Sequence, residues 1–214
     1  RMWWVPHGLS ATDGAYVMQP ANEMFAIVCL ESHRAGAAVI GENLGTVPSA
    51  VAAALDRHQL LGMKVAQDGL IEPDPDELIA LSTHDTPPFA AWWKSTDIDD
   101  GEDLGVYADG RGDTARADRS DTIAYLEELL STSGLDDTRD AIMAWMAASP
   151  AAVAVVNVDD LWAEERSQNV PGTDAERPNW RARHVHPMED IATDARILTQ
   201  LESLRRLRNG DQTG

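Results

Sequence analysis

The sequence contains a single cysteine, Cys29, and no apolar run approaching the roughly 20 residues that a membrane-spanning helix needs. One cysteine excludes a disulfide within the chain and is typical of a reducing compartment. We therefore expect a cytoplasmic protein that makes no membrane contact. The apolar neighbours of Cys29, from Ile27 to Leu30, favour a buried structural thiol over a nucleophile.

Basic residues are also scarce, because 17 lysines and arginines face 36 acids, for a net charge of −19 over 214 residues. Such a surface repels phosphate backbones and anionic lipid, so we expect no nucleic-acid or membrane partner, and a neutral substrate fits better. Phenylalanine and tyrosine number only 2 and 3, against 7 tryptophans. Tryptophan offers a flat face on which sugar rings stack, although core packing is the commoner use of any single tryptophan.

Short apolar runs alternate along the chain with segments of helical periodicity. Strands are predicted over 37–40, 62–66, 78–83 and 151–158. Helices are predicted over 20–34, 48–58, 89–93, 121–131, 137–148 and 190–208. Strands that alternate with helices favour a parallel α/β sheet. Four strands are too few for a closed (β/α)8 barrel of about 250 residues, so the pattern indicates either a small open sheet or half of a barrel.

The first residues favour the half barrel. The chain begins at Arg1 and continues at once into the apolar Met2 to Val5, so we expect the second half of a TIM barrel, truncated at the N-terminus. We expect 1–208 to form this part of a catalytic barrel. Residues 97–121, rich in acids and interrupted by glycines, are predicted as an exposed acidic loop or insertion, and 209–214 as a disordered tail.

Glu42 follows the predicted strand 37–40 directly, between Gly41 and Asn43. A glutamate at the end of an apolar strand is costly unless it is paired or faces a site. Position alone leaves two interpretations even: a site carboxylate, or an ordinary strand-end acid that is salt-bridged or solvated.

His84 and Asp85 follow the predicted strand 78–83. The sequence contains no G-x-S-x-G motif, so a Ser-His-Asp triad is disfavoured. The pair suits substrate hydroxyls better, because histidine donates and aspartate accepts. The alternative is that Asp85 caps the helix predicted at 89–93.

Carboxylates at separate strand ends suit glycoside chemistry, in which one acid protonates the departing oxygen and another attacks the sugar. Other constellations are weaker. His184 and His186 have a spacing found in metal sites, but no third ligand is near and a surface pair is favoured, so no metal site is predicted. Asp159 and Asp160 follow the predicted strand 151–158 and could flank a cleft at the strand ends, but a helix cap supplied by one of them is favoured.

These motifs together resemble the 4-α-glucanotransferases, also called amylomaltases or disproportionating enzymes, of glycoside hydrolase family 77. The resemblance is specific through the combination and order of its blocks and covers nearly the whole chain. The blocks are Trp3 to Gly8, Asp13 to Val17, Leu30 to Arg34, Gly41 to Pro48, Gly62 to Val65, Ser82 to Thr86, Gln168 to Thr173 and Pro178 to Arg181.

The resemblance implies a TIM barrel that needs no cofactor and transfers a segment of an α-1,4-glucan to a 4-hydroxyl of glucose or of another glucan, by a retaining double displacement. Its implied partners are α-1,4-glucans and maltooligosaccharides; oligomeric state stays open. By motif position Glu42 resembles the general acid/base and Asp85 the carboxylate that stabilises the transition state. His84, Asn169 and Gly172 resemble substrate-binding residues.

Two departures from the family pattern matter. Position 43 is asparagine where the family usually has aspartate. The Arg-Ile-Asp-His-like segment that carries the nucleophile is absent, so we expect this chain alone to be inactive. Two alternatives remain open: a hydrolase or isomerase of the α-amylase clan, and a non-catalytic glucan-binding domain.

Overall fold

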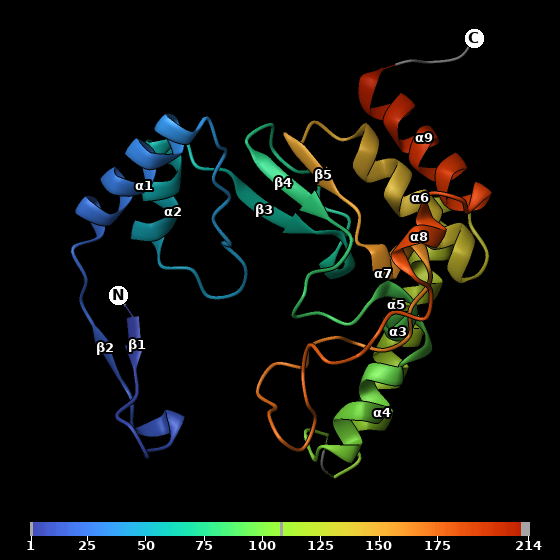
Figure 1. Cartoon of the computed structure of the whole chain (residues 1–214). Coiled ribbons are helices and arrows are strands. Elements are labelled where there is room, and N and C mark those ends of the chain that lie inside the picture. The colour runs from blue at the N-terminus through green and yellow to red at the C-terminus, as the bar shows by residue number, and fades with distance from the viewer. Residues whose placement is uncertain (1, 108, 211–214) are drawn as a thin grey trace. The chain divides into compact units, whose positions relative to one another are not determined.

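The computed structural model describes residues 2–107 and 109–210, which fall into two compact units (Figure 1). Unit 1 comprises Arg1–Gly62 and unit 2 comprises Met63–Gly214.

Unit 1 opens with a small hairpin that the sequence did not predict. Strands β1 (Met2–Trp4) and β2 (Ala15–Val17) pair antiparallel, and the 3-10 helix η1 (Ala11–Asp13) lies between them. Trp3 stands opposite Tyr16, with ring centroids 4.8 Å apart in an edge-on arrangement. Strands of three residues are too short to show a periodicity, so their pairing is seen in the structure and not in the sequence.

The two predicted helices of unit 1 are confirmed as α1 (Ala21–Ala35) and α2 (Ser49–His58). The Phe25 ring of α1 stacks on the His58 ring of α2 at 5.3 Å. Cys29 is half-buried in α1, so the expectation of a buried thiol is not met.

The predicted buried strand over 37–40 is wrong. Only Ile40 forms a parallel bridge, with Leu61, and it is 41% exposed. Two backbone hydrogen bonds surround the bridge: Gly41 N donates to Leu61 O, and Leu61 N donates to Val39 O. An apolar run becomes a buried strand only when neighbours cover it, and in the described part of unit 1 this run pairs on one side alone.

Unit 2 is built on a sheet whose strand order is β3 (Gly62–Val65), β4 (Glu77–Ala80) and β5 (Val153–Val155). β4 and β5 are parallel, with Ile79 opposite Ala154, and the arrows of β3 and β4 point the same way in Figure 1. The three strands predicted here are confirmed, each shorter than expected. After β3 the 3-10 helix η2 (Ala66–Asp68) begins, β4 ends three residues early, and β5 is shorter at both ends.

Seven helices of the described part of unit 2 follow the strands. They are α3 (Phe89–Lys94), α4 (Thr96–Asp103), α5 (Arg111–Leu130), α6 (Leu135–Ala148), α7 (Val158–Leu161), α8 (Met188–Ile191) and α9 (Ala195–Asn209). The core joins Ile79 and Leu81 to Phe89 and Trp92 of α3 and to Met146 of α6. α9 packs along α6 (Figure 1).

The exposed loop predicted over 97–121 is wrong for most of its length, because α4 and the first half of α5 occupy it. Arginines of α5 neutralise the acids of α4: Arg119 holds Asp97 through two hydrogen bonds of 2.9 and 3.0 Å, and Arg116 contacts Glu102. Gly101 lies within α4, at a place where a Cβ would lie 2.6 Å from the Tyr107 ring. The local composition of acids and glycines predicts a loop, but in the structure this segment forms two helices that are held together by charge pairs.

The predicted C-terminal helix is divided into α8 and α9. Asp194 begins α9, where its carboxylate accepts hydrogen bonds from the backbone N–H groups of Arg196 and Ile197 at 2.8 and 3.1 Å. Residues 211–214 of the expected disordered tail lie outside the described residues. Among the helices described, none combines the length and the apolar character that crossing a membrane requires.

Candidate active site

A pocket of about 370 Å³ lies in unit 2 beyond the carboxyl ends of β4 and β5, the edge where parallel α/β sheets place their chemistry. Its lining comes from the loop after β4, from the start of α7 and from the long loop that precedes α8. The lining residues are Ser82, Thr83, His84, Thr86, Pro88, Asn157, Val158, Asp159, Gln168, Trp180, Ala182 and His184.

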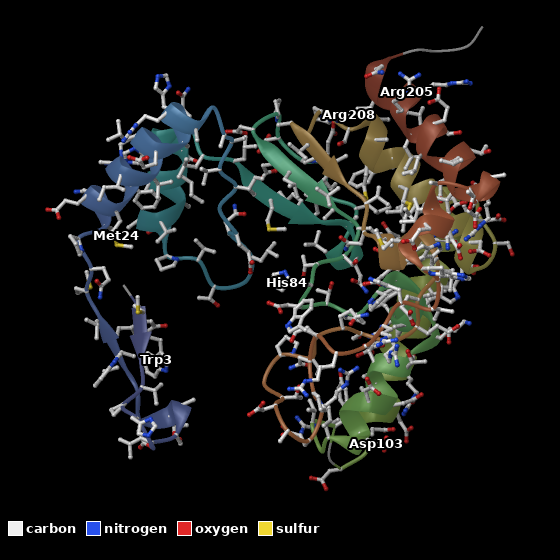
Figure 2. All side chains as sticks on the ribbon, viewed as in Figure 1. Trp3, Met24, His84, Asp103, Arg205 and Arg208 are labelled. Atoms are coloured by element: carbon white, nitrogen blue, oxygen red, sulfur yellow. The ribbon has the colours of Figure 1, made fainter. Side chains whose placement is uncertain are left out.

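The loop between β4 and α3 is a tight turn that carries His84 and Asp85. Thr83 N donates to Thr86 Oγ1 at 2.7 Å, and Asp85 N donates to Thr83 Oγ1 at 3.2 Å. These bonds leave both predicted site side chains accessible, with 59% of His84 and 47% of Asp85 exposed. Figure 2 shows His84 projecting from the loop that follows β4.

The structure brings together three residues that the sequence analysis proposed. Asn169 Nδ2 donates to Asp85 Oδ1 at 2.6 Å, although 84 positions separate them. His84 Nε2 lies 3.4 Å from Asp85 Oδ2. The Asp85–Asn169 contact lies beside the pocket lining rather than within it. One carboxylate oxygen is thus fixed by an amide, while the other faces a histidine.

Asp160, not Asp85, caps the start of α3. Asp160 is fully buried, and its Oδ1 accepts the backbone N–H of Phe89 at 2.7 Å. Its Oδ2 accepts from Ser82 Oγ at 2.7 Å, and Asn157 Nδ2 donates to the same hydroxyl at 2.8 Å. Burial raises the pKa of Asp160, and the hydrogen bonds from Phe89 and Ser82 oppose that rise. The alternative in which Asp85 caps this helix is therefore wrong, and one buried carboxylate anchors both ends of the loop 83–88.

Substituting Asp160 with alanine is expected to lower the free energy of unfolding by about 3 kcal/mol, because it leaves a buried N–H and a buried hydroxyl without their acceptors. Urea unfolding of the 214-residue chain measures the change. Asp121→Ala, at an exposed site on α5, is the matched control and is expected to change stability by less than about 0.5 kcal/mol. Equal stabilities for the two variants would show that the buried network does not anchor the loop.

Asp159 and His184 form one wall of the pocket. His184 Nδ1 lies 3.1 Å from Asp159 Oδ1, and burial raises the pKa of Asp159 while the charge of His184 lowers it. The Trp162 ring lies 5.6 Å from the His184 ring and 5.5 Å from that of His186. No group of three histidine, cysteine or acidic side chains suited to a metal occurs among the residues described. Asp159 thus flanks the cleft and Asp160 supplies the cap, so each earlier alternative holds for one of the pair.

Gly172 lies at an exposed turn of the loop before α8, with φ 86°, and is not among the pocket-lining residues. Asn179 closes this turn: its Oδ1 accepts from Val170 N at 3.0 Å, and its Nδ2 donates to Thr173 O at 3.1 Å. The structure therefore leaves the predicted substrate-binding role of Gly172 as a prediction.

Trp180 and Gln168 are pocket residues that the sequence analysis did not single out. Trp180 is 60% exposed, and its ring centroid lies 6.1 Å from that of His84. Its backbone N–H donates to Gln168 O at 2.8 Å. The signal was present in the block Pro178 to Arg181, where a tryptophan stands among polar residues rather than in an apolar run.

Glu42 belongs to unit 1, in the loop between the Ile40 bridge and α2. Its side chain is exposed, and no ion pair within the described ranges involves it. The salt-bridged form of the ordinary interpretation is thus unsupported, which leaves the solvated acid and the site carboxylate. Neighbouring Asn43 is half-buried.

Comparison with known proteins gives a consistent result. A family model described as 4-alpha-glucanotransferase matches residues 1–187. The 4-alpha-glucanotransferase of Mycobacterium tuberculosis (strain ATCC 25618 / H37Rv) is 35% identical over 232 residues, which cover 96% of this chain and 32% of the relative. That of Haemophilus influenzae is 30% identical over 233 residues, covering 98% and 33%. The chain spans about a third of the length of these curated relatives.

Two solved structures share the fold. An amylomaltase from Corynebacterium glutamicum superposes with a TM-score of 0.82 at 24% identity, covering 94% of this chain and 33% of the other. An amylomaltase from Streptococcus agalactiae, in complex with acarbose, gives a TM-score of 0.68 at 18% identity, covering 96% and 38%. At these identities the likeness concerns the mixed helix-and-sheet fold.

Proposed function

The chain belongs to the 4-alpha-glucanotransferase family, and from that premise we propose that it forms the second half of a TIM barrel that transfers segments of α-1,4-glucans. The observation that carries the proposal is the assembly of Asp85, Asn169 and His84 beside a pocket at the carboxyl ends of β4 and β5. The acarbose bound by the streptococcal amylomaltase supports an oligosaccharide as the ligand class.

The chemistry that we propose is a retaining double displacement. A carboxylate attacks the anomeric carbon while a general acid protonates the departing O4, which releases the first product and leaves a covalent glycosyl-enzyme. The general acid, now deprotonated, then acts as base: it removes the proton from an acceptor 4-hydroxyl as that oxygen attacks the anomeric carbon and displaces the enzyme carboxylate, which leaves as a free carboxylate. Glu42 is our general acid/base, since its accessible carboxyl is not engaged in an ion pair with another described residue.

Asp85 acts differently in this proposal. Its Oδ1 is held by Asn169, so the carboxylate is oriented before substrate arrives. It accepts stronger hydrogen bonds from the ring hydroxyls as the sugar gains oxocarbenium character. The transition state is therefore stabilised more than the bound substrate, which lowers the activation barrier. His84 donates to substrate hydroxyls from the adjacent position, and Gly172 leaves space for the donor sugar. The nucleophile comes from outside these 214 residues, so the chain alone is inactive.

Maltotriose distinguishes transfer from its alternatives. We expect no product from the 214-residue chain by itself. A chimaera in which the chain replaces the matching third of the M. tuberculosis relative should release glucose and form a ladder of longer maltooligosaccharides. Hydrolysis would yield only shorter sugars. The intact mycobacterial relative serves as the assay control.

Two outcomes contradict the proposal. Turnover by the chain alone would mean that its own residues supply the nucleophile. If a folded chimaera binds maltoheptaose but forms no products longer than its substrate, the chain is a glucan-binding domain or part of a hydrolase instead.

A further inference from the structure

We propose that Trp180 and Gln168 form a glucosyl-binding subsite within unit 2, in which one sugar ring stacks on the indole while its hydroxyl groups accept a hydrogen bond from Gln168 and donate to a carboxylate of the pocket wall. The subsite lies beside the sugar contacted by His84 and Asp85, and in that respect it rests on the proposed function.

Core packing does not account for Trp180. Trp92 is buried in the core of unit 2, and Trp93 and Trp145 pack against that core. Trp180 instead leaves 60% of its surface exposed while lining the pocket. An indole that neither fills the core nor is covered by it presents a flat apolar face, which suits the C–H face of a pyranose.

The backbone of Trp180 is held in an unfavourable conformation. Its φ of 59° lies in the left-handed region, which residues with a Cβ rarely adopt. The hydrogen bond from Trp180 N to Gln168 O and the two bonds of the Asn179 side chain to the turn at Val170 and Thr173 maintain it. Strain that the surroundings over-determine is characteristic of ligand-binding positions, where it fixes the direction of a side chain.

Gln168 supplies an independent observation. Its Nε2 is buried and has no hydrogen-bond partner in the part of the chain that the structure describes, although the side chain lines the pocket. A buried donor without an acceptor is costly, and a ligand hydroxyl at this position would satisfy it. Gln168 also holds the Trp180 backbone, so the unsatisfied amide and the exposed ring belong to the same structural unit.

Other residues of the same lining complete a sugar-binding arrangement. The His84 ring lies 6.1 Å from the indole, and the Asp159 carboxylate, which contacts His184, offers an acceptor in the same lining. The pocket volume of about 370 Å³ falls in the range of roughly 300–1,000 Å³ typical of small-molecule sites. An aromatic face flanked by one free donor and one carboxylate is suited to a neutral polyhydroxylated ring, not to an anion.

Three substitutions at position 180 distinguish the contribution of the indole ring to binding from the effect of the backbone conformation on stability. In calorimetric titrations of the 214-residue chain with maltoheptaose, Trp180→Ala is expected to weaken binding about tenfold, while Trp180→Phe, which keeps an aromatic face, stays within about threefold of wild type. Trp180→Gly should weaken binding as much as alanine, yet its unfolding temperature should equal or exceed that of wild type, because glycine adopts this φ freely.

Gln168→Met tests the second observation. It removes the donor at similar volume, so we expect maltoheptaose affinity to fall several-fold while the unfolding temperature does not fall. Tyr125→Ala is the matched control, since Tyr125 is 61% exposed on α5 and lies outside the pocket lining. Its affinity should equal that of wild type.

The outcomes separate this subsite from the proposed function. Wild-type affinity in Trp180→Ala would overturn the subsite and leave the transferase proposal intact. A lower unfolding temperature in Trp180→Gly, with affinity unchanged, would assign Trp180 a structural role. Because all the named groups lie in unit 2, a wild-type chain that fails to bind maltoheptaose would also overturn the subsite, whereas transfer by the chimaera independently tests the reaction.

Discussion

Glu42→Gln in the chimaera is expected to lower kcat for maltotriose disproportionation by roughly 10²- to 10⁴-fold, the contribution typical of general acid–base catalysis. The amide keeps the size of the side chain but neither protonates a departing O4 nor accepts a proton from an acceptor hydroxyl. Stability should not change, because Glu42 is exposed and makes no ion pair with the other described residues. The measurement is kcat by glucose release, together with the unfolding midpoint of each variant.

The pH profile and a matched control make this test specific. Loss of the proton-transfer group should remove a limb from the pH dependence of kcat, which loss of a merely structural acid would not do. Glu23→Gln, at an exposed site in the first turn of α1, should leave kcat within about twofold of wild type. A folded Glu42→Gln protein with nearly wild-type kcat would eliminate our acid/base assignment.

The sequence predicted the helices better than the strands, for a physical reason. α1, α2 and α6 extend over several turns, so their apolar spacing identifies them before any tertiary contact is known. The apolar run ending at Ile40 carries no such information, since a strand is defined by its neighbours and, among the residues of unit 1 that the structure describes, only Leu61 pairs with it. The sequence also could not show that arginines of α5 neutralise the acids of α4, because those pairs cross a turn.

The candidate site shows the same division. Asp85 and Asp160 both follow predicted strands, and local spacing left Asp85 as an alternative cap of α3. Folding gives that position to Asp160, which lies 71 residues from Phe89 and is buried where a charge needs donors. The Asp85–Asn169 contact likewise depends on which loops the sheet brings together. Residue types at strand ends predict the chemistry of a site, whereas its pairings require the fold.

Asp85→Asn should lower kcat by roughly 10²- to 10³-fold with little change in KM. The amide oxygen still accepts the hydrogen bond from Asn169, so the side chain keeps its orientation. What disappears is the negative charge that complements the oxocarbenium-like transition state, and a group acting there affects kcat more than binding. Steady-state kinetics of the chimaera with maltotriose give both constants.

Asn169→Ala identifies what holds Asp85 in place. It keeps the charge but removes the 2.6 Å hydrogen bond, so the carboxylate rotates more freely and kcat should fall only about tenfold. Because Asn169 acts through Asp85, the double substitution should be little worse than Asp85→Asn alone. Additive losses would mean that Asn169 contacts substrate independently, and an Asp85→Asn variant that raised KM at unchanged kcat would make Asp85 a ground-state binding group. Asp174→Asn, an exposed acid in the same loop as Asn169, controls for the loss of one charge and should leave both constants within about twofold of wild type.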